Sequence, residues 1–319
     1  MKKIVNKLLF GGNKIAKGKV KGFMGFTHVQ ISFLLFLLIY LFPFDFVKSY
    51  VESIKPLQIF FPVLFIVAGS ALLPDLDNGS DKSTASYQLG FVGRLLSTGM
   101  QTICAIVLSL FRMKDDRKPV SMHRYLWHTP FVSISITLLF WFCIEDGNVP
   151  MYKLMMDAYK TGTIPMFLIN NLPSIICIFV SFVAIKLGFN MLSFVPLKFI
   201  PIDMKAKLII QNAAVAILTG MVFMMNASQL KFAGAAIGIG WLFHILGDAI
   251  TQGSAPLIWP IPKFWGKKRM WWWNPWLLGP AQIYTGGLVN KIIDFALIGV
   301  NGVLFYFVIR DIVIPMISK

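Results

Sequence analysis

Apolar residues along the chain gather in eight long runs, which polar and basic segments separate. The runs cover residues 29–44, 57–74, 89–111, 125–144, 164–185, 208–225, 231–247 and 288–313. A helix rises about 1.5 Å per residue, so about 20 apolar residues are needed to cross the hydrocarbon layer of a bilayer. The pattern therefore predicts an all-α fold, a polytopic transmembrane helical bundle.

The run at 89–111 differs from the others because it contains Arg94, Gln101 and several Gly and Ser residues. A strongly basic segment, residues 112–124, follows it. Basic loops stay on the cytoplasmic side of a membrane, so this segment would lie on the wrong side if 89–111 crossed. We therefore predict a re-entrant or interfacial helix at 89–111 and about seven membrane spans elsewhere.

The polar segments predict how the chain is divided and oriented. Residues 1–27 are basic and form a cytoplasmic N-terminal segment, residues 28–313 form one transmembrane domain, and residues 314–319 form a short tail. With the N-terminus in the cytoplasm, most of the 30 basic residues fall on the cytoplasmic side. The first apolar run has no small-residue cleavage pattern, so we expect no cleaved signal peptide.

Composition supports a membrane location and limits the partners. The chain is 56% hydrophobic and 14% charged, with a mean hydropathy of +0.70, whereas about a quarter of a soluble domain is charged. The net charge of +16 would suit nucleic acid, but basic residues in a membrane protein face anionic lipid headgroups. We therefore expect lipid headgroups as partners and no direct nucleic-acid binding.

Polar residues with metal-binding chemistry stand at the ends of several runs, all on the predicted cytoplasmic side. The four histidines of the chain and three aspartates share this placement: His28, Asp75, Asp77, His123, His128, His244 and Asp248. A carboxylate at the edge of the hydrocarbon layer is costly unless it is paired, hydrated or bound to a cation. Their common location therefore points to a metal site.

Local spacing supports this placement. His244 and Asp248 are four residues apart and share one face of a helix. Pro74 stops the preceding helix, which leaves Asp75 on a constrained loop. Thr129 followed by a proline is typical of an N-cap and the first helical position, so His128 should lie just outside its helix.

The residue types indicate the metal and the chemistry. Imidazole and carboxylate ligands suit Zn²⁺, which we prefer, with Mn²⁺ or Fe²⁺ as alternatives, and the ligands exceed one tetrahedral site. We therefore predict two ions, which would clamp a phosphate and activate a bridging water. The predicted metal ligands are His28, Asp75, His123, His128, His244 and Asp248.

For some residues the sequence leaves two possible roles open. Asp75 or Asp77 would position or deprotonate the attacking water, although Asp77 equally fits a carboxylate that caps a turn. Arg124, Thr251 and Ser254 are candidates for contacts to phosphate oxygens, and Arg124 equally fits a lipid headgroup. A single histidine in a span is more often a packed side chain than a ligand, so the prediction depends on the whole set.

These motifs resemble the YdjM-like family of bacterial inner-membrane proteins, described as metal-dependent hydrolases and as LexA-binding. The matching segments are Thr27-His28, residues 72–77, His123-Arg124 with His128-Thr129, residues 240–260, and a weaker match at 284–287. The family's aspartate loop usually continues with histidine and proline, where this chain has Asn78-Gly79. The order of His and Asp residues is also distantly similar to zinc-dependent phospholipase C.

The resemblance implies a location in the bacterial cytoplasmic membrane and hydrolysis of a phosphoester on a lipid or lipid-linked substrate. A LexA-like regulator is implied as a partner by the family name alone. Two other functions remain open from the residues. A divalent-metal transporter also uses intramembrane His and Asp, although near mid-bilayer, and a non-catalytic membrane regulator could hold a structural metal.

Overall fold

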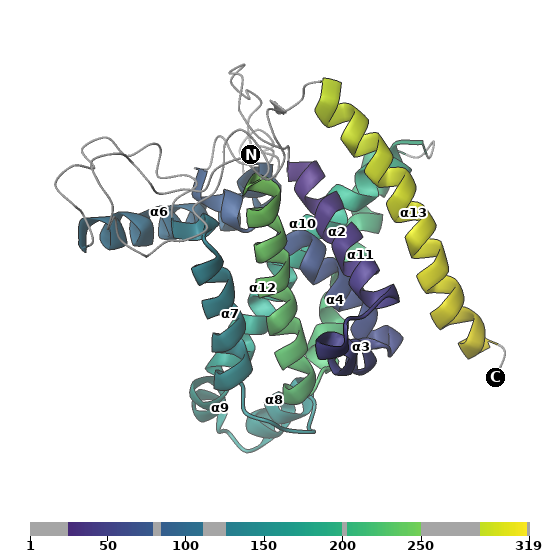
Figure 1. The fold of residues 1–319 in the computed structure, drawn as a ribbon. Coiled ribbons are helices and arrows are strands. Elements are labelled where there is room, and N and C mark those ends of the chain that lie inside the picture. Colours follow the sequence, from purple (N-terminus) through teal and green to yellow (C-terminus); the bar gives the residue numbers. More distant parts are fainter. Residues whose placement is uncertain (1–24, 79–83, 111–125, 200–202, 250–287, 318–319) are drawn as a thin grey trace.

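The computed structural model describes residues 25–78, 84–110, 126–199, 203–249 and 288–317, and these form helices joined by turns (Figure 1). An isolated antiparallel bridge joins Pro150 to Asn226. In chain order the elements are α2 (Gly25–Leu41), η1 (Asp45–Val47), α3 (Lys48–Ile54), α4 (Leu57–Ser70), η2 (Pro74–Asn78), α5 (Thr84–Leu89), α6 (Phe91–Leu110), η3 (Leu126–His128), α7 (Pro130–Cys143), α8 (Met151–Lys160), α9 (Ile164–Asn170), α10 (Leu172–Phe199), α11 (Met204–Met224), α12 (Ala227–Ala249) and α13 (Leu288–Ile317).

Five of the described helical segments are long and apolar enough to cross a membrane. They begin at Leu57, Leu172, Met204, Ala227 and Asn290. A sixth span arises if α2 and the η1–α3 segment, which meet at a bend of 96°, count as one. Helix α7 has only 14 residues and packs along α12 as the remaining predicted crossing (Figure 1). The predicted all-α bundle with membrane spans is therefore confirmed, with five or six spans of sufficient length among the described residues where about seven were predicted.

Helix α6 lies across one end of the bundle, whereas α7, α12 and α13 run along it (Figure 1). We call this the α6 end; helices α8 and α9 lie at the opposite end, the α8 end. Apolar side chains line one side of α6 and are strongly exposed, including Phe91, Leu95 and Ile106. This arrangement agrees with the interfacial helix predicted for residues 89–111.

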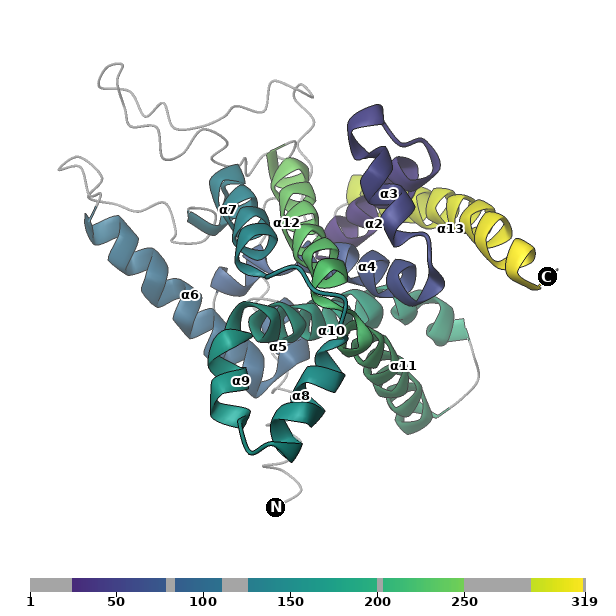
Figure 2. The same ribbon diagram turned by 90° about the horizontal axis from the view of Figure 1, so that it is seen from below.

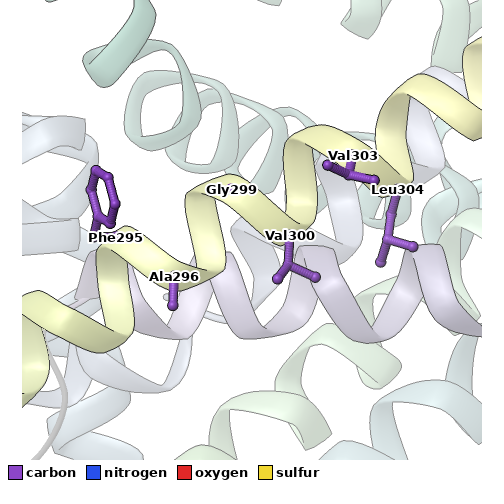
Figure 3. A pocket seen from close by; sticks show the side chains of 6 residues that line it. All are labelled: Phe295, Ala296, Gly299, Val300, Val303 and Leu304. Carbon is purple, nitrogen blue, oxygen red and sulfur yellow. The ribbon is translucent and has the colours of Figure 1, made fainter.

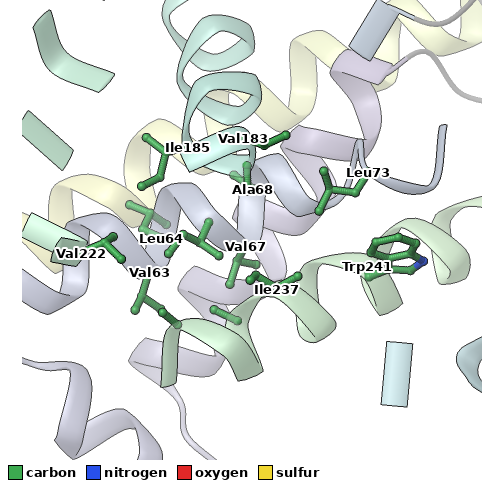
Figure 4. Close-up of a cluster of buried hydrophobic side chains, with 14 of the residues drawn as sticks. Val63, Leu64, Val67, Ala68, Leu73, Val183, Ile185, Val222, Ile237 and Trp241 are labelled. Atoms are coloured by element: carbon green, nitrogen blue, oxygen red, sulfur yellow. The ribbon is translucent and has the colours of Figure 1, made fainter. Parts of the chain in front are cut away.

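Helices α4 and α12 form the centre of the bundle. Their spanning windows are 78% and 72% buried, whereas those of α11 and α13 are 17% and 11% buried. Figure 4 shows the core around Val63, Leu64 and Val67 of α4, which meets apolar side chains from other helices. The exposed sides of the outer helices are themselves apolar, as expected where lipid replaces water as the solvent.

Glycines let the central helices approach closely. Gly69 of α4 lies against the backbone of Ala184 and Gly188 in α10, and Gly240 of α12 lies against the carbonyl of Val67 in α4. A Cβ at Gly69 or Gly240 would overlap these backbone atoms. Small residues at such crossings are typical of membrane helices, whose association depends on close packing rather than on the hydrophobic effect.

Helix α10 is longer than the sequence predicted. The apolar run was expected to end at residue 185, but the helix continues through Lys186 to Phe199. The predicted end of this run is therefore wrong. Leu187 and Met191 beyond it are buried, so one lysine interrupts the apolar run without ending the helix. A long lysine side chain can reach polar surroundings from inside a helix.

Helix α13 lies at the edge of the bundle and packs mainly on α2 (Figure 2). Two buried polar contacts join them. The Asn301 amide donates to the carbonyl and side-chain oxygens of Gln30 at 3.0 and 2.6 Å, and Thr27 is hydrogen-bonded to Asn290 and Asp294. Polar contacts of this kind hold membrane helices together where apolar surface gives no preference between protein and lipid.

The close crossing at Gly69 makes a testable prediction. We expect Gly69→Ala to lower the free energy of unfolding by roughly 1–3 kcal/mol, because the added methyl group must displace the backbone of Ala184. Gly220→Ala on α11 is the matched control, since a Cβ there meets nothing within 4 Å. The measurement is thermal unfolding in detergent. Equal melting temperatures for the two variants would contradict the described crossing.

Candidate metal centre

Six of the predicted site residues come together at the α6 end. His28 lies in the first turn of α2, Asp75 and Asp77 in η2 after α4, and His128 in η3 before α7. His244 and Asp248 lie in the last turns of α12. Five of the six side chains are almost completely buried, and that of Asp75 is 23% exposed. The other predicted site residues, namely His123, Arg124, Thr251 and Ser254, lie outside the described residues.

His244 is held in one orientation by the backbone. Its Nδ1 lies 2.6 Å from the carbonyl oxygen of Ala71, at the end of α4. A carbonyl oxygen only accepts hydrogen bonds, so Nδ1 must carry the proton and donate it. In a neutral imidazole the lone pair then belongs to Nε2, the atom that points toward Asp75 and Asp248. A ring fixed in this way is typical of metal-ligating histidines.

Four ligand atoms surround one position. The Nε2 atom of His128 lies 3.7 Å from Asp75 Oδ1 and 3.6 Å from Asp248 Oδ2. The Nε2 atom of His244 lies 3.8 and 3.4 Å from the same two oxygens. A tetrahedral ion with bonds of about 2.0–2.1 Å separates its ligands by about 3.3–3.4 Å. The four imidazole–carboxylate separations are close to this value, and Asp75, His128 and His244 form one group whose ligand atoms could hold a divalent ion.

The carboxylate of Asp248 faces two ways. While Oδ2 belongs to the group just described, Oδ1 lies 3.4 Å from Nε2 of His28. The rings of His28 and His244 are also neighbours, with centroids 4.1 Å apart. His28, His244 and Asp248 thus form a second group that could hold an ion, next to Asp75, His128 and His244. A carboxylate that uses one oxygen for each group can bridge two ions.

Asp77 lies behind His128 rather than beside the ligand atoms. Its Oδ2 is 3.6 Å from Nδ1 of His128, the ring nitrogen that faces away from Asp75 and Asp248. Burial alone lowers the pKa of His128, but the carboxylates of Asp77, Asp75 and Asp248 outweigh burial and raise the pKa to about 9. The same negative field that favours a proton on this imidazole favours a metal cation beside it.

Helix α6 supports the two loops that carry these ligands. The side-chain amide of Gln101 donates to the carbonyl oxygen of Asp77 at 2.9 Å. The indole of Trp127, next to His128, donates to the carbonyl oxygen of Met100 at 2.9 Å. Trp241 of α12 donates in turn to the carbonyl oxygen of Trp127 at 2.6 Å. The helix predicted as interfacial therefore positions the site from one side.

The predicted N-cap is confirmed. The Thr129 side chain accepts a hydrogen bond from the backbone of Val132, with a proline at the start of α7. The Thr129 hydroxyl also donates to the carbonyl oxygen of Leu126 at 2.8 Å, which closes the η3 turn. This turn fixes His128 outside the helix, as the sequence predicted.

Sequence reasoning missed several supporting residues. Gly247 leaves room for the His28 imidazole, since a Cβ there would press on its Nδ1. Thr27, the neighbour of His28, donates to Asp294 Oδ1 at 2.5 Å, and Asn290 donates to both at 2.8 Å. Helices α12 and α13 thus fix His28 from two sides. The sequence could have indicated Asp294, because a carboxylate inside an apolar run is unusual. No neighbouring residue indicates the role of Gly247.

A shallow apolar groove on α13 is separate from this chemistry. It is lined by Phe295, Ala296, Gly299, Val300, Val303 and Leu304 (Figure 3). These side chains carry no ligand atoms, so the groove suits contact with lipid chains and not metal binding.

Comparison with known proteins gives no family for the chain. No protein-family model matches it, and neither a curated protein nor a solved structure matches it significantly.

The position of Asp77 makes a testable prediction. We expect Asp77→Asn to weaken divalent-metal binding by about 10- to 100-fold, the usual effect of losing a carboxylate behind a ligating histidine. Asp157→Asn, an exposed aspartate on α8, is the matched control and should leave the affinity unchanged. Metal affinity is measured by calorimetric titration of the purified protein. Equal affinities for the two variants would show that Asp77 does not support His128.

Proposed function

We propose that the protein is a membrane-bound, metal-dependent hydrolase that cleaves a phosphoester of a lipid or lipid-linked substrate. The observation that carries this proposal is the set of four imidazole–carboxylate separations of 3.4–3.8 Å at one end of the bundle. The ligands lie at helix ends, the level at which phosphate headgroups would lie, and Asp75 is 23% exposed there. The resemblance to the YdjM-like family is in line with this chemistry.

The proposed roles follow from the position of each side chain. Asp75, His128 and His244 would hold one divalent ion, with Asp248 Oδ2 close to both ring nitrogens, and His28 with Asp248 Oδ1 would contact a second; zinc is preferred, with Mn²⁺ or Fe²⁺ as alternatives. An ion held by these residues would lower the pKa of a coordinated water and so supply a nucleophile for phosphoester hydrolysis. Asp75, the most exposed of the set, is the best candidate to position this water, and Asp77 orients His128.

We place the α6 end in the cytoplasm of a bacterial cell. Exposed acidic residues cluster at the α8 end, in the loops around α3 and α8: Asp45, Glu52, Glu145, Asp146 and Asp157. Lys205 and Lys207 begin α11 at the α6 end, and most of the basic residues of the sequence fall on this side of the predicted alternation. Basic residues are retained on the cytoplasmic side, which supports this orientation.

The proposed orientation can be tested by labelling. In a background without Cys104, Cys143 and Cys177, a single cysteine at Lys205 should react only after the membrane is permeabilised. A single cysteine at Lys153, exposed on α8, should react in intact cells. The reverse pattern would show that the protein has the opposite orientation. Labelling of both positions in intact cells would contradict the predicted alternation of the spans.

The proposed activity can be tested with purified protein. We expect His244→Gln to remove most of the bound metal, because His244 is the residue that belongs to both groups of ligands. Hydrolysis of phospholipid or lipid-phosphate substrates should fall by at least about a hundredfold, the scale on which a lost metal ligand acts. Asp146→Asn, which alters an exposed ion pair with Lys231 at the α8 end, should keep full activity.

The same preparation distinguishes the alternatives. Metal binding without any phosphate release would contradict the hydrolase and leave a structural metal site. Flux of divalent metal into liposomes would instead support a transporter.

A further inference from the structure

We propose that the two ion positions are unequal, and that the second is completed only when the phosphate of a substrate binds beside it. This inference rests on the proposed metal-dependent function and concerns the order in which the site fills. It follows from the number of protein ligands at each position and from the charge of the cluster.

The first position has the larger number of candidate protein ligands. Asp75 Oδ1, Asp248 Oδ2 and the Nε2 atoms of His128 and His244 surround it. The hydrogen bond of His244 to Ala71 fixes the ring before a metal arrives. An ion at this position needs little rearrangement of the protein, which favours tight binding.

The second position has fewer ligands of its own. His28 Nε2 and Asp248 Oδ1 lie 3.4 Å apart on this side. His244 belongs to both groups, but its Nδ1 already donates to a carbonyl oxygen, so its Nε2 serves one ion. Among the described residues, the second ion thus has His28 and the Oδ1 oxygen of Asp248 as protein ligands, and Asp248 also contributes Oδ2 to the first position. A divalent ion takes at least four ligands, and the remaining places fall to water or substrate.

The charge of the cluster favours an anion as the additional ligand. Asp75, Asp77 and Asp248 carry three negative charges when ionised, and the three imidazoles are neutral when they bind metal. One divalent ion leaves this set with a net charge of −1, which repels a phosphate group. A second ion changes the net charge to +1, which attracts it. Phosphate and the second ion should therefore each strengthen the binding of the other, as linkage requires.

The experiment uses the full-length protein in detergent, with Mn²⁺ as the metal and inorganic phosphate as the anion. Electron paramagnetic resonance counts free and bound Mn²⁺ and detects two ions that share a bridging ligand. Without phosphate we expect one tightly bound Mn²⁺ per chain and a second that binds at least about tenfold more weakly. Saturating phosphate should tighten the second by about tenfold or more and produce the spin-coupled signal.

Two variants assign the positions. His28→Gln should keep the tight ion and lose the phosphate-dependent one, whereas His128→Gln should weaken the tight ion. Thermal unfolding checks that each variant is folded, and the wild-type titration tests the proposal even if a variant fails this check. Perchlorate at equal ionic strength is the control for general salt effects.

Several outcomes would overturn the inference. These are two ions of equal affinity without phosphate, a second affinity that phosphate does not change, or loss of the tight ion in His28→Gln. Each of these leaves the metal-dependent function intact. A wild-type protein that binds no Mn²⁺, Zn²⁺ or Fe²⁺ would contradict both proposals, whereas ordered binding without hydrolysis of any lipid phosphoester would contradict only the proposed activity.

Discussion

Negative charge gathered at the edge of the hydrocarbon layer is the constraint on which the arrangement of the α6 end depends. Asp77 and Asp248 are almost completely buried, and Asp75 is mostly so. Uncompensated charges in such surroundings cost several kcal/mol each. The three imidazoles that face these carboxylates offset part of this cost, and the cations of the proposed metal site would offset more of it.

Close helix packing makes this concentration of charge possible. The two central helices, α4 and α12, carry the aspartate loop and the His244–Asp248 pair at adjoining ends. Gly240 brings their backbones together one turn before His244, which lets that ring reach the carbonyl of Ala71. The glycines therefore position the site as well as the helices, because a larger distance between α4 and α12 would move their ligand atoms apart.

The sequence predicted what depends on local spacing. The shared helix face of His244 and Asp248, the N-cap at Thr129 and the crosswise helix near Arg94 follow from signals within a few residues. It could not predict the supporting contacts, such as those of Gln101 with the η2 loop, because they join residues far apart in the chain. The extension of α10 past Lys186 was missed because a single charge in an apolar run does not decide where a helix ends.

The attachment of α13 has a consequence for the surroundings of the protein. This helix is largely exposed and is joined to α2 by polar contacts at Gln30 and Thr27, the latter next to His28 in the chain. A membrane span can respond to a change in bilayer thickness by tilting. A change in the tilt of α13 would act through these contacts on the first turn of α2. Lipid composition could in this way affect the position of the His28 imidazole.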